Sequence, residues 1–353
     1  MCCQARPRHE RCRLRQDDRV SGPWPRPFRG RLDEHVVTSE ALRDNALGDP
    51  HERPLWVWTP PGYDDEPDRR YPSVYVIQGY TGQVDMWRNR SAFRRNFPEL
   101  LDDLAPACVV AFVDTWTSVG GSQFVDSPAT GRYHTYLCDE LVPWVDRRYR
   151  TLAAARHRGI QGKSSGGYGA LLTAMLRPDL FGGVANHAGG GLFEVSIRPF
   201  FRNAVRTLRE LYGGSPEAWL ADFRARAAFS RPNDIHLLLQ HGFSAAYSTD
   251  GEIRLPYDTS TAEVIPELWE RWLAWDWPTL VPRHADALRG LQAIWIDSGT
   301  RDEWFLDLTV EWLRRELTSI GVPDLHAELF DATHAEIEYR YPLGLTYLVE
   351  RLS

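Results

Sequence analysis

Residues 162–167 read GKSSGG, and this short stretch decides the fold. A short β-like run precedes it at 158–161, and a good helix-forming segment follows it at 168–177. The G-x-S-x-G spacing between a strand and a helix is typical of a sharp turn that holds Ser164 in a strained backbone conformation. The flanking glycines are needed because a Cβ there would collide with the neighbouring strand and helix. Such a turn lifts the Ser164 hydroxyl out of the sheet and places the positive end of the helix beside it.

The segments on either side of this turn alternate between strands and helices. Helices are predicted at 137–149, with a kink at Pro143, at 304–317 and at the end of the chain through residue 352. Strands are predicted at 35–38, 55–59, 73–78, 107–113, 158–161, 183–186, 292–296 and 326–330. This order predicts an α/β fold in which a mostly parallel central sheet carries helices on both faces.

One region breaks the alternation. Residues 189–284 are helical in pattern and rich in aromatic side chains, including Phe200, Phe201, Tyr212, Trp219, Trp269, Trp272, Trp275 and Trp277. Because open α/β sheets bind ligands at the carboxyl ends of their strands, we interpret this insertion as a cap over that edge. The alternative is a packing elaboration that does not contact substrate. The predicted organisation is a disordered Arg/Pro-rich tail at 1–31 and one domain at 32–353 that contains the cap.

Charge is divided unevenly between the tail and the domain. Residues 1–31 hold nine Arg and three Asp or Glu, a net charge of +6, which leaves −13 for the rest of a chain whose net charge is −7. An acidic body argues against nucleic acid as a partner. No apolar run approaches the ~20 residues that span a bilayer, so no membrane partner is expected. The N-terminal segment lacks the apolar core of a secretory signal, which favours a cytoplasmic location.

The number of cysteines also favours a cytoplasmic location. There are five, an odd number, and this does not suggest a disulfide framework in a chain of this length. Cys2, Cys3 and Cys12 lie in the tail at a spacing that matches no zinc site, so neither a metal nor a cofactor is expected. Cys108 and Cys138 are predicted to be packed thiols in a reducing compartment.

Two loops downstream of Ser164 carry candidates for acid–base chemistry. A serine hydroxyl needs a base to remove its proton, and that base needs an orienting acid. His334 lies directly after the last predicted strand and is the predicted base. Asp302 follows a glycine turn after the preceding strand and is the predicted acid. Asp297, at the end of that strand, is the alternative acid, while Glu303 is predicted in the first turn of the next helix.

A third loop, at 78–82, is predicted to complete an anion site. Acyl transfer needs two donors where a carbonyl oxygen becomes negative. The backbone N–H of Ser165, the residue after the serine, is the first predicted donor. Glycines on both sides of Tyr80 and Thr81 let the loop turn inward, so the Tyr80 N–H is the second.

Two residues admit a functional and a structural interpretation. His187 follows the strand after the serine turn, so it would either line a pocket or serve as a hydrogen-bonded structural histidine. Lys163 is the only lysine in the chain and stands beside the serine. Its ammonium would either be required by the chemistry or form an ordinary salt bridge.

The chain resembles the α/β-hydrolases and, within them, the putative esterase (esterase D-like) family. The resemblance spans about 32–352, and GKSSGGYGA (162–170), DSGTRD (297–302) and THAEIEYRYP (333–342) carry most of it. It implies a nucleophile, acid and base at Ser164, Asp302 and His334, with oxyanion donors at Tyr80 and Ser165. The segment GGSQFVDS (120–127) is similar to the one that flanks the active-site mouth in the family, which implies that Gln123 and Phe124 lie near substrate.

The resemblance also has departures. The 78–82 loop lacks the Ser-Gly-Leu-Thr-Cys form of the family's S-formylglutathione hydrolases, and the 189–284 insertion is longer than in minimal members. We therefore expect a serine carboxylic-ester hydrolase that forms an acyl-enzyme on a small-molecule ester. The alternatives are an acyltransferase, a thioesterase, and a ligand-binding protein on an inactive hydrolase scaffold. The expected pocket residues are Gly79, Trp87, Trp116, Gln123, Phe124 and His187.

Overall fold

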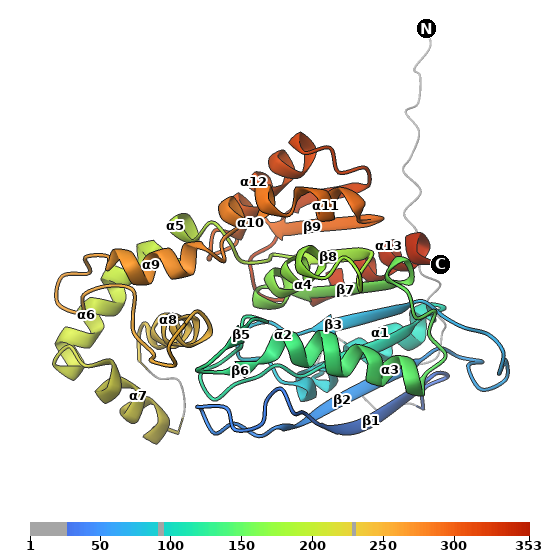
Figure 1. The fold of residues 1–353 in the computed structure, drawn as a ribbon, viewed down its shortest axis with the longest axis horizontal. Coiled ribbons are helices and arrows are strands. Elements are labelled where there is room, and N and C mark those ends of the chain that lie inside the picture. Colours follow the sequence, from blue (N-terminus) through green and yellow to red (C-terminus); the bar gives the residue numbers. More distant parts are fainter. Residues whose placement is uncertain (1–26, 91–94, 228–230) are drawn as a thin grey trace, which may run out of the picture.

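The computed structural model describes residues 27–90, 95–227 and 231–353, and eight of the strands in these ranges form one sheet (Figure 1). The strand order is β1-β2-β4-β3-β7-β8-β9-β10. β2 pairs antiparallel with β1 and β4, and the other neighbours pair in parallel, which confirms the mostly parallel sheet. The strand bounds are β1 Arg31–Thr38, β2 Glu52–Thr59, β3 Ser73–Ile77, β4 Val109–Val113, β7 Arg158–Lys163, β8 Gly183–His187, β9 Ala293–Gly299 and β10 Leu325–Phe330.

Alternate side chains of the central strands pack into two separate hydrophobic cores, one on each face of the sheet. In β3, Tyr75 and Ile77 face one core while Val74 and Val76 face the other. The first core is covered by α3 (Val142–Arg148), α4 (Ser165–Leu176) and α12 (Leu306–Ser319), and the second by α1 (Phe97–Leu104) and α13 (Tyr341–Leu352). Because both faces are buried, the strands need apolar residues at every position, which explains the continuous apolar runs in the sequence.

The helix predicted at 137–149 is confirmed as part of a continuous helical stretch from Tyr133 to Arg148, but it is not a regular α-helix throughout. The structure has a short α2 (Tyr133–Thr135), a stretch of wider π-type turns (Tyr136–Leu141) and then α3. Pro143 closely follows the π-type turns, and because it has no backbone N–H it cannot donate to a carbonyl of the preceding turn. The helix thus runs on past the proline, and its irregularity is the set of π-type turns just before Pro143.

The insertion between β8 and β9 is helical, as predicted. It consists of α5 (Phe193–Ser196), α6 (Phe201–Tyr212), α7 (Pro216–Ala225), α8 (Asp234–Ala246), α9 (Pro266–Leu273), α10 (Trp277–Arg283) and α11 (Ala285–Gly290). Helices α5 to α9 gather beside one end of the sheet, at the left of Figure 1. The Phe201 ring contacts the rings of Tyr257, Trp269 and Trp272, so many of the aromatic residues form the insertion's own core.

The start of the domain differs slightly from the predicted boundary at residue 32. β1 begins at Arg31, and the backbone N–H groups of Arg29 and Gly30 donate to Asp102 Oδ1 at 2.7 and 2.8 Å. Residues 1–26 of the predicted tail, including Cys2, Cys3 and Cys12, lie outside the described residues. Cys108 and Cys138 are buried free thiols, as predicted.

Neither a membrane-spanning helix nor a cluster of metal ligands is present among the described residues. None of their helices has the length and apolar character needed to cross a membrane. No group of three or more His, Cys, Asp or Glu side chains in the same ranges is arranged to hold a metal ion.

Candidate active site

Ser164 stands between the last residue of β7 and the first residue of α4. Its backbone adopts φ 59° and ψ −125°, a left-handed φ that a residue with a side chain rarely adopts. The turn is held in place because the Ser164 N–H donates to the His187 carbonyl at the end of β8, at 2.9 Å. Strain at a residue that the fold fixes this firmly is a common property of functional sites.

The glycines around Ser164 are required by close backbone contacts. A Cβ on Gly162 would lie 2.4 Å from the Gly166 carbonyl group. A Cβ on Gly166 would lie 2.6 Å from the Ile77 carbonyl oxygen. Any side chain at either position would therefore push α4 away from the sheet, which is the collision expected from the sequence.

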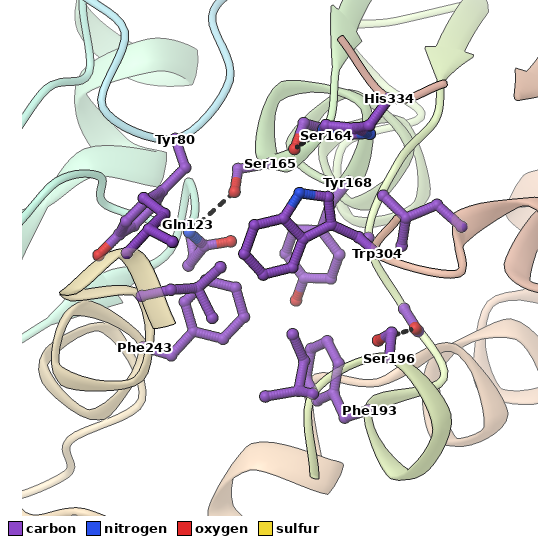
Figure 2. Close-up of a pocket in the computed structure, with 16 residues that line it drawn as sticks. Tyr80, Gln123, Ser164, Ser165, Tyr168, Phe193, Ser196, Phe243, Trp304 and His334 are labelled. Carbon is purple, nitrogen blue, oxygen red and sulfur yellow. Dashed lines mark hydrogen bonds between the residues drawn. The ribbon is translucent and has the colours of Figure 1, made fainter. Parts of the chain in front are cut away.

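His334 and Asp302 meet Ser164 in one hydrogen-bonded chain (Figure 2 shows the serine and histidine). His334 Nε2 lies 3.0 Å from Ser164 Oγ, and His334 Nδ1 lies 2.7 Å from Asp302 Oδ2. The Asp302 side chain is fully buried and also accepts the Trp304 backbone N–H at 2.9 Å. These contacts fix the imidazole between a hydroxyl and a buried carboxylate, although the three residues lie far apart in the sequence.

The loops that carry Asp302 and His334 are bonded to each other. The Arg301 N–H donates to the Ala332 carbonyl at 2.9 Å, and the Thr300 N–H donates to the Phe330 carbonyl at 2.8 Å. Glu303 lies before α12, not in its first turn as predicted, and its Oε2 accepts the His334 backbone N–H at 2.9 Å. Consecutive acidic residues therefore hold the ring and the backbone of the same histidine.

Asp297, the alternative acid, belongs to a separate buried cluster. Its carboxylate accepts from Trp295 Nε1 and Arg340 Nε and pairs with His187 Nδ1, at 2.7 to 2.8 Å. Burial favours a raised pKa for Asp297, but His187 and then Arg340 and Trp295 hold that pKa below its usual value. The structure thus places Asp302, and not Asp297, against His334. His187 is fully buried and hydrogen-bonded, so its structural interpretation holds.

The 78–82 loop passes directly beside the serine. A Cβ on Gly79 would lie 3.4 Å from Ser164 Cβ, and Tyr80 lines the same cavity as Ser164 and Ser165. Within the described residues, neither the Tyr80 N–H nor the Ser165 N–H donates to a protein acceptor. Ser165 is the first residue of α4, so its amide points out of the helix N-terminus.

A cavity of about 260 Å³ opens over these groups (Figure 2). Its walls come from the serine turn with the start of α4, from the insertion with α5 and α8, from Trp304 and the start of α12, and from the loops that carry Tyr80, Gln123 and His334. The lining residues are Tyr80, Gln123, Ser164, Ser165, Tyr168, Gly190, Gly191, Phe193, Ser196, Ile197, Ile235, Leu239, Phe243, Trp304, Leu306 and His334. The insertion therefore contributes part of the cavity wall, which favours the cap interpretation over a packing elaboration.

Of the six expected pocket residues, only Gln123 lines this cavity, and its Nε2 donates to Ser165 Oγ at 3.2 Å. Gly79 packs under the serine turn, and the Phe124 ring packs against Gly169 inside α4. Trp87 is buried among Phe97, Phe112 and Tyr341, and the Trp116 carbonyl accepts from Arg53 at 2.6 Å. His187 pairs with Asp297. These five residues do not line the cavity, because a position in or near a motif loop does not fix which way a side chain or a glycine backbone faces.

Lys163 forms an ordinary ion pair. Its Nζ donates to Glu338 Oε1 at 2.8 Å, and the Glu338 side chain is 42% exposed. The pair joins the end of β7 to the segment that follows His334. The ammonium is directed at Glu338 and Lys163 does not line the cavity, so the salt-bridge interpretation holds.

Most of the apolar residues that line the cavity were not among the predicted pocket residues. Ile235, Leu239 and Phe243 lie at intervals of four residues along α8, which places them on one face of that helix. This spacing was present in the sequence as a signal. It could not show which face of the helix meets the active-site serine, because that depends on how the insertion docks.

Comparison with known proteins agrees with this geometry. The family described as "Putative esterase" matches residues 49–335. A Corynebacterium glutamicum protein described as uncharacterized is 27% identical over 172 residues, and the match covers 48% of this chain and 38% of that protein. The chain thus matches well under two thirds of that relative's length.

Solved structures share the fold at low sequence identity. A ferulic acid esterase superposes with a TM-score of 0.57 at 16% identity, covering 93% of this chain and all of the other. An S-formylglutathione hydrolase from Agrobacterium tumefaciens gives 0.56 at 18% identity, covering 93% and 98%. A fluorophosphonate-binding serine hydrolase of Staphylococcus aureus gives 0.56 at 14% identity, covering 91% and 98%. These likenesses show the α/β-hydrolase fold, and because the family match spans most of the sequence, the chain belongs to the putative esterase family.

Proposed function

We propose that this protein is a serine esterase that hydrolyses small carboxylic esters through an acyl-enzyme on Ser164. The observation that carries the proposal is the continuous chain from Asp302 through His334 to Ser164, with distances of 2.7 and 3.0 Å. A histidine held between a buried carboxylate and a serine hydroxyl is the arrangement that activates serine as a nucleophile. Membership of an esterase family supports the same reaction.

In the first half of the reaction, Ser164 Oγ attacks the ester carbonyl carbon while His334 Nε2 takes the hydroxyl proton. Asp302 holds the proton on His334 Nδ1 and stabilises the imidazolium that forms. The carbonyl oxygen becomes negative and accepts hydrogen bonds from the Tyr80 and Ser165 amides, with the N-terminus of α4 behind them. The C–O bond to the alcohol then breaks, and the departing oxygen takes the proton from His334.

In the second half, a water molecule enters the site and loses a proton to His334 as it attacks the acyl carbon. The same two amides stabilise the second oxyanion. The bond between the carbon and Ser164 Oγ breaks, and the proton returns from His334 to Ser164. The products are a carboxylic acid and the regenerated serine, and no cofactor takes part in these steps.

The test is hydrolysis of p-nitrophenyl esters by the wild type, Ser164→Ala and His334→Ala. We expect each substitution to lower turnover by on the order of 10⁴- to 10⁶-fold, as in other serine triads. Labelling of Ser164 by a fluorophosphonate provides a readout that does not depend on choosing the right ester. Wild-type protein that is neither labelled nor active would favour a ligand-binding protein on an inactive scaffold.

Two related reactions use the same three residues. Addition of a competing alcohol, followed by product analysis, separates hydrolysis from acyl transfer. Comparison of a thioester with its oxygen ester identifies a thioesterase. The cytoplasmic location expected from the cysteines and the N-terminal segment is likewise a proposal, tested by fractionation of the source cells.

A further inference from the structure

The wall opposite the catalytic groups is formed by apolar side chains of the cap. Figure 2 shows Ser164, Ser165 and His334 on one side of the cavity, with Phe193 and Phe243 on the other. Phe193 comes from α5, and Phe243 lies on the same face of α8 as Leu239 and Ile235. A group attached to the reacting carbonyl and extending into this space would contact hydrocarbon on several sides.

Two polar groups of the cap side of the cavity are already hydrogen-bonded within the protein. Ser196 Oγ donates to the Gly191 carbonyl at 2.7 Å, and the Tyr168 hydroxyl donates to the Trp275 carbonyl at 2.8 Å. They leave little demand for polar partners on a ligand. Moreover, no Asp, Glu, Lys or Arg is among the described residues that line the cavity. A charged group placed there would lose its hydration without gaining a counter-ion, which is costly.

The size of the cavity limits the group that fits. Its volume of about 260 Å³ lies just below the roughly 300–1,000 Å³ of sites for drug-sized ligands. At about 30 Å³ for a water-sized unit, the cavity accommodates on the order of eight non-hydrogen atoms. One end is bounded by Ile235, which is 36% exposed, and Trp304, so the cavity communicates with solvent there.

We propose that the physiological ester carries an uncharged, apolar group of about six to nine non-hydrogen atoms, and that this group lies along the Ile235–Leu239–Phe243 face of α8. This inference rests on the proposed function, because it places the reacting carbonyl at Ser164. Each methylene that leaves water for this wall should raise kcat/KM by up to about fourfold until the cavity is full. A carboxylate at the end of the same chain should abolish that gain.

The test compares two ester series with the full-length protein. One series lengthens the acyl group of p-nitrophenyl esters from acetate to decanoate, and the other lengthens the alcohol of acetate esters. We expect kcat/KM in at least one series to rise at least tenfold from two carbons to an optimum at six to eight, and then to fall. The p-nitrophenyl monoester of adipic acid, which matches hexanoate in length but ends in a carboxylate, should react at least 100-fold more slowly than hexanoate.

A substitution in the cap then tests whether the apolar group of the ester lies against α8. Leu239→Trp fills part of the cavity and should lower the ratio of the octanoate to the acetate rate at least tenfold. The matched control is Leu211→Trp on α6, a cap position that is 53% exposed and outside the cavity, and it should leave both rates unchanged. Thermal unfolding of both variants checks that each is folded.

The outcomes separate this inference from the proposed function. A flat or falling profile in both series would overturn the apolar-group inference. If the acyl series is the one that rises, equal rates for adipate and hexanoate or an unchanged ratio in folded Leu239→Trp would also overturn it; if the alcohol series rises, the same comparisons are made with the corresponding alcohols. If fluorophosphonate still labels Ser164 in that case, the esterase assignment stands. Absence of both labelling and hydrolysis overturns the two proposals together.

Discussion

The carboxylate of Glu303 accepts the backbone N–H of His334 at 2.9 Å, one residue after Asp302 binds the imidazole ring of the same histidine. The Asp302 loop thus forms two hydrogen bonds with His334, one to its ring and one to its backbone. The ring cannot shift toward or away from Ser164 without breaking one of these two bonds. Glu303 contacts neither the serine nor the cavity, so we infer that it is a positioning residue that acts through His334.

Substitutions at Glu303 should separate its hydrogen bond from its charge. Glu303→Gln keeps an acceptor oxygen and should retain kcat within about threefold, whereas Glu303→Leu should lose about 10- to 100-fold in kcat, since small misplacements of a catalytic group are costly. KM should change little in both variants, because Glu303 does not line the cavity. Steady-state kinetics on one p-nitrophenyl ester tests this, and equal losses in the two variants would contradict a positioning role.

Substitution of the two candidate acids should affect different properties, kcat for Asp302 and folding stability for Asp297. Asp302→Asn should remain folded and lose ~10⁴-fold in kcat, because the amide favours the wrong histidine tautomer. Asp297→Asn leaves His187 and Arg340 without their buried carboxylate, so it should cost about 3–5 kcal/mol of stability while the folded fraction stays active. Urea unfolding and kcat for both variants make the comparison, and a stable but inactive Asp297→Asn would reverse the assignment of the acid.

Tyr80 connects the oxyanion loop to the cap. Its hydroxyl lies 2.5 Å from the Val119 carbonyl and 2.7 Å from the Leu238 carbonyl of α8, so its single proton can serve only one of them at a time. Tyr80→Phe retains the backbone amide but loosens this link. We expect about a tenfold loss in kcat and a loss of about 1–2 kcal/mol in stability.

The matched control for that substitution is Tyr347→Phe on α13. Tyr347 donates to Asp324 Oδ1 at 2.5 Å and lies outside the cavity, so it should show a similar loss of stability with kcat unchanged. If both variants lost activity in proportion to stability, Tyr80 would have no special link to the active site.

Asp276 gives the cap a pH dependence of its own. It accepts the backbone N–H groups of Phe193 and Trp277, both at 2.8 Å, and burial raises its pKa from 3.8 to about 6 despite these bonds. Because the folded pKa lies above the unfolded one, the resulting stability is fully present below pH 3.8 and is lost as the pH rises to about 6. The shift corresponds to about 3 kcal/mol.

Unfolding of the wild type and Asp276→Asn by urea from pH 4 to pH 7 tests this. The excess stability of the wild type over the variant should shrink by up to about 3 kcal/mol as the pH rises. The comparison with the variant is needed because a second group changes the protein's stability over the same pH range. Burial lowers the pKa of His241 to about 4, so His241 makes the folded protein less stable as the pH falls from 6.5, which opposes the effect of Asp276. A difference that is independent of pH would show that Asp276 does not titrate in this range.

Much of the fold could be predicted because strands buried on both faces leave a local signal. β3, β4 and the core of β9 are continuous apolar runs, and their bounds were predicted to within two residues except at the end of β9, which lies three residues later. The π-type turns at Tyr136–Leu141 could not be predicted, because the spacing of apolar residues around Pro143 also fits a regular α-helix. Tertiary packing decides between these two forms.

By itself, the sequence determined the strained turn at Ser164 and the order of the loops that carry Asp302 and His334. It could do so because glycine spacing and strand ends are local properties, and parallel strands bring their carboxyl ends to one edge of the sheet. Only the tertiary structure decided that Asp297 pairs with His187, that Glu303 holds His334, and that α8 turns Leu239 toward the serine. These relationships depend on side-chain direction and on the docking of the cap, which are set by contacts between residues far apart in the chain.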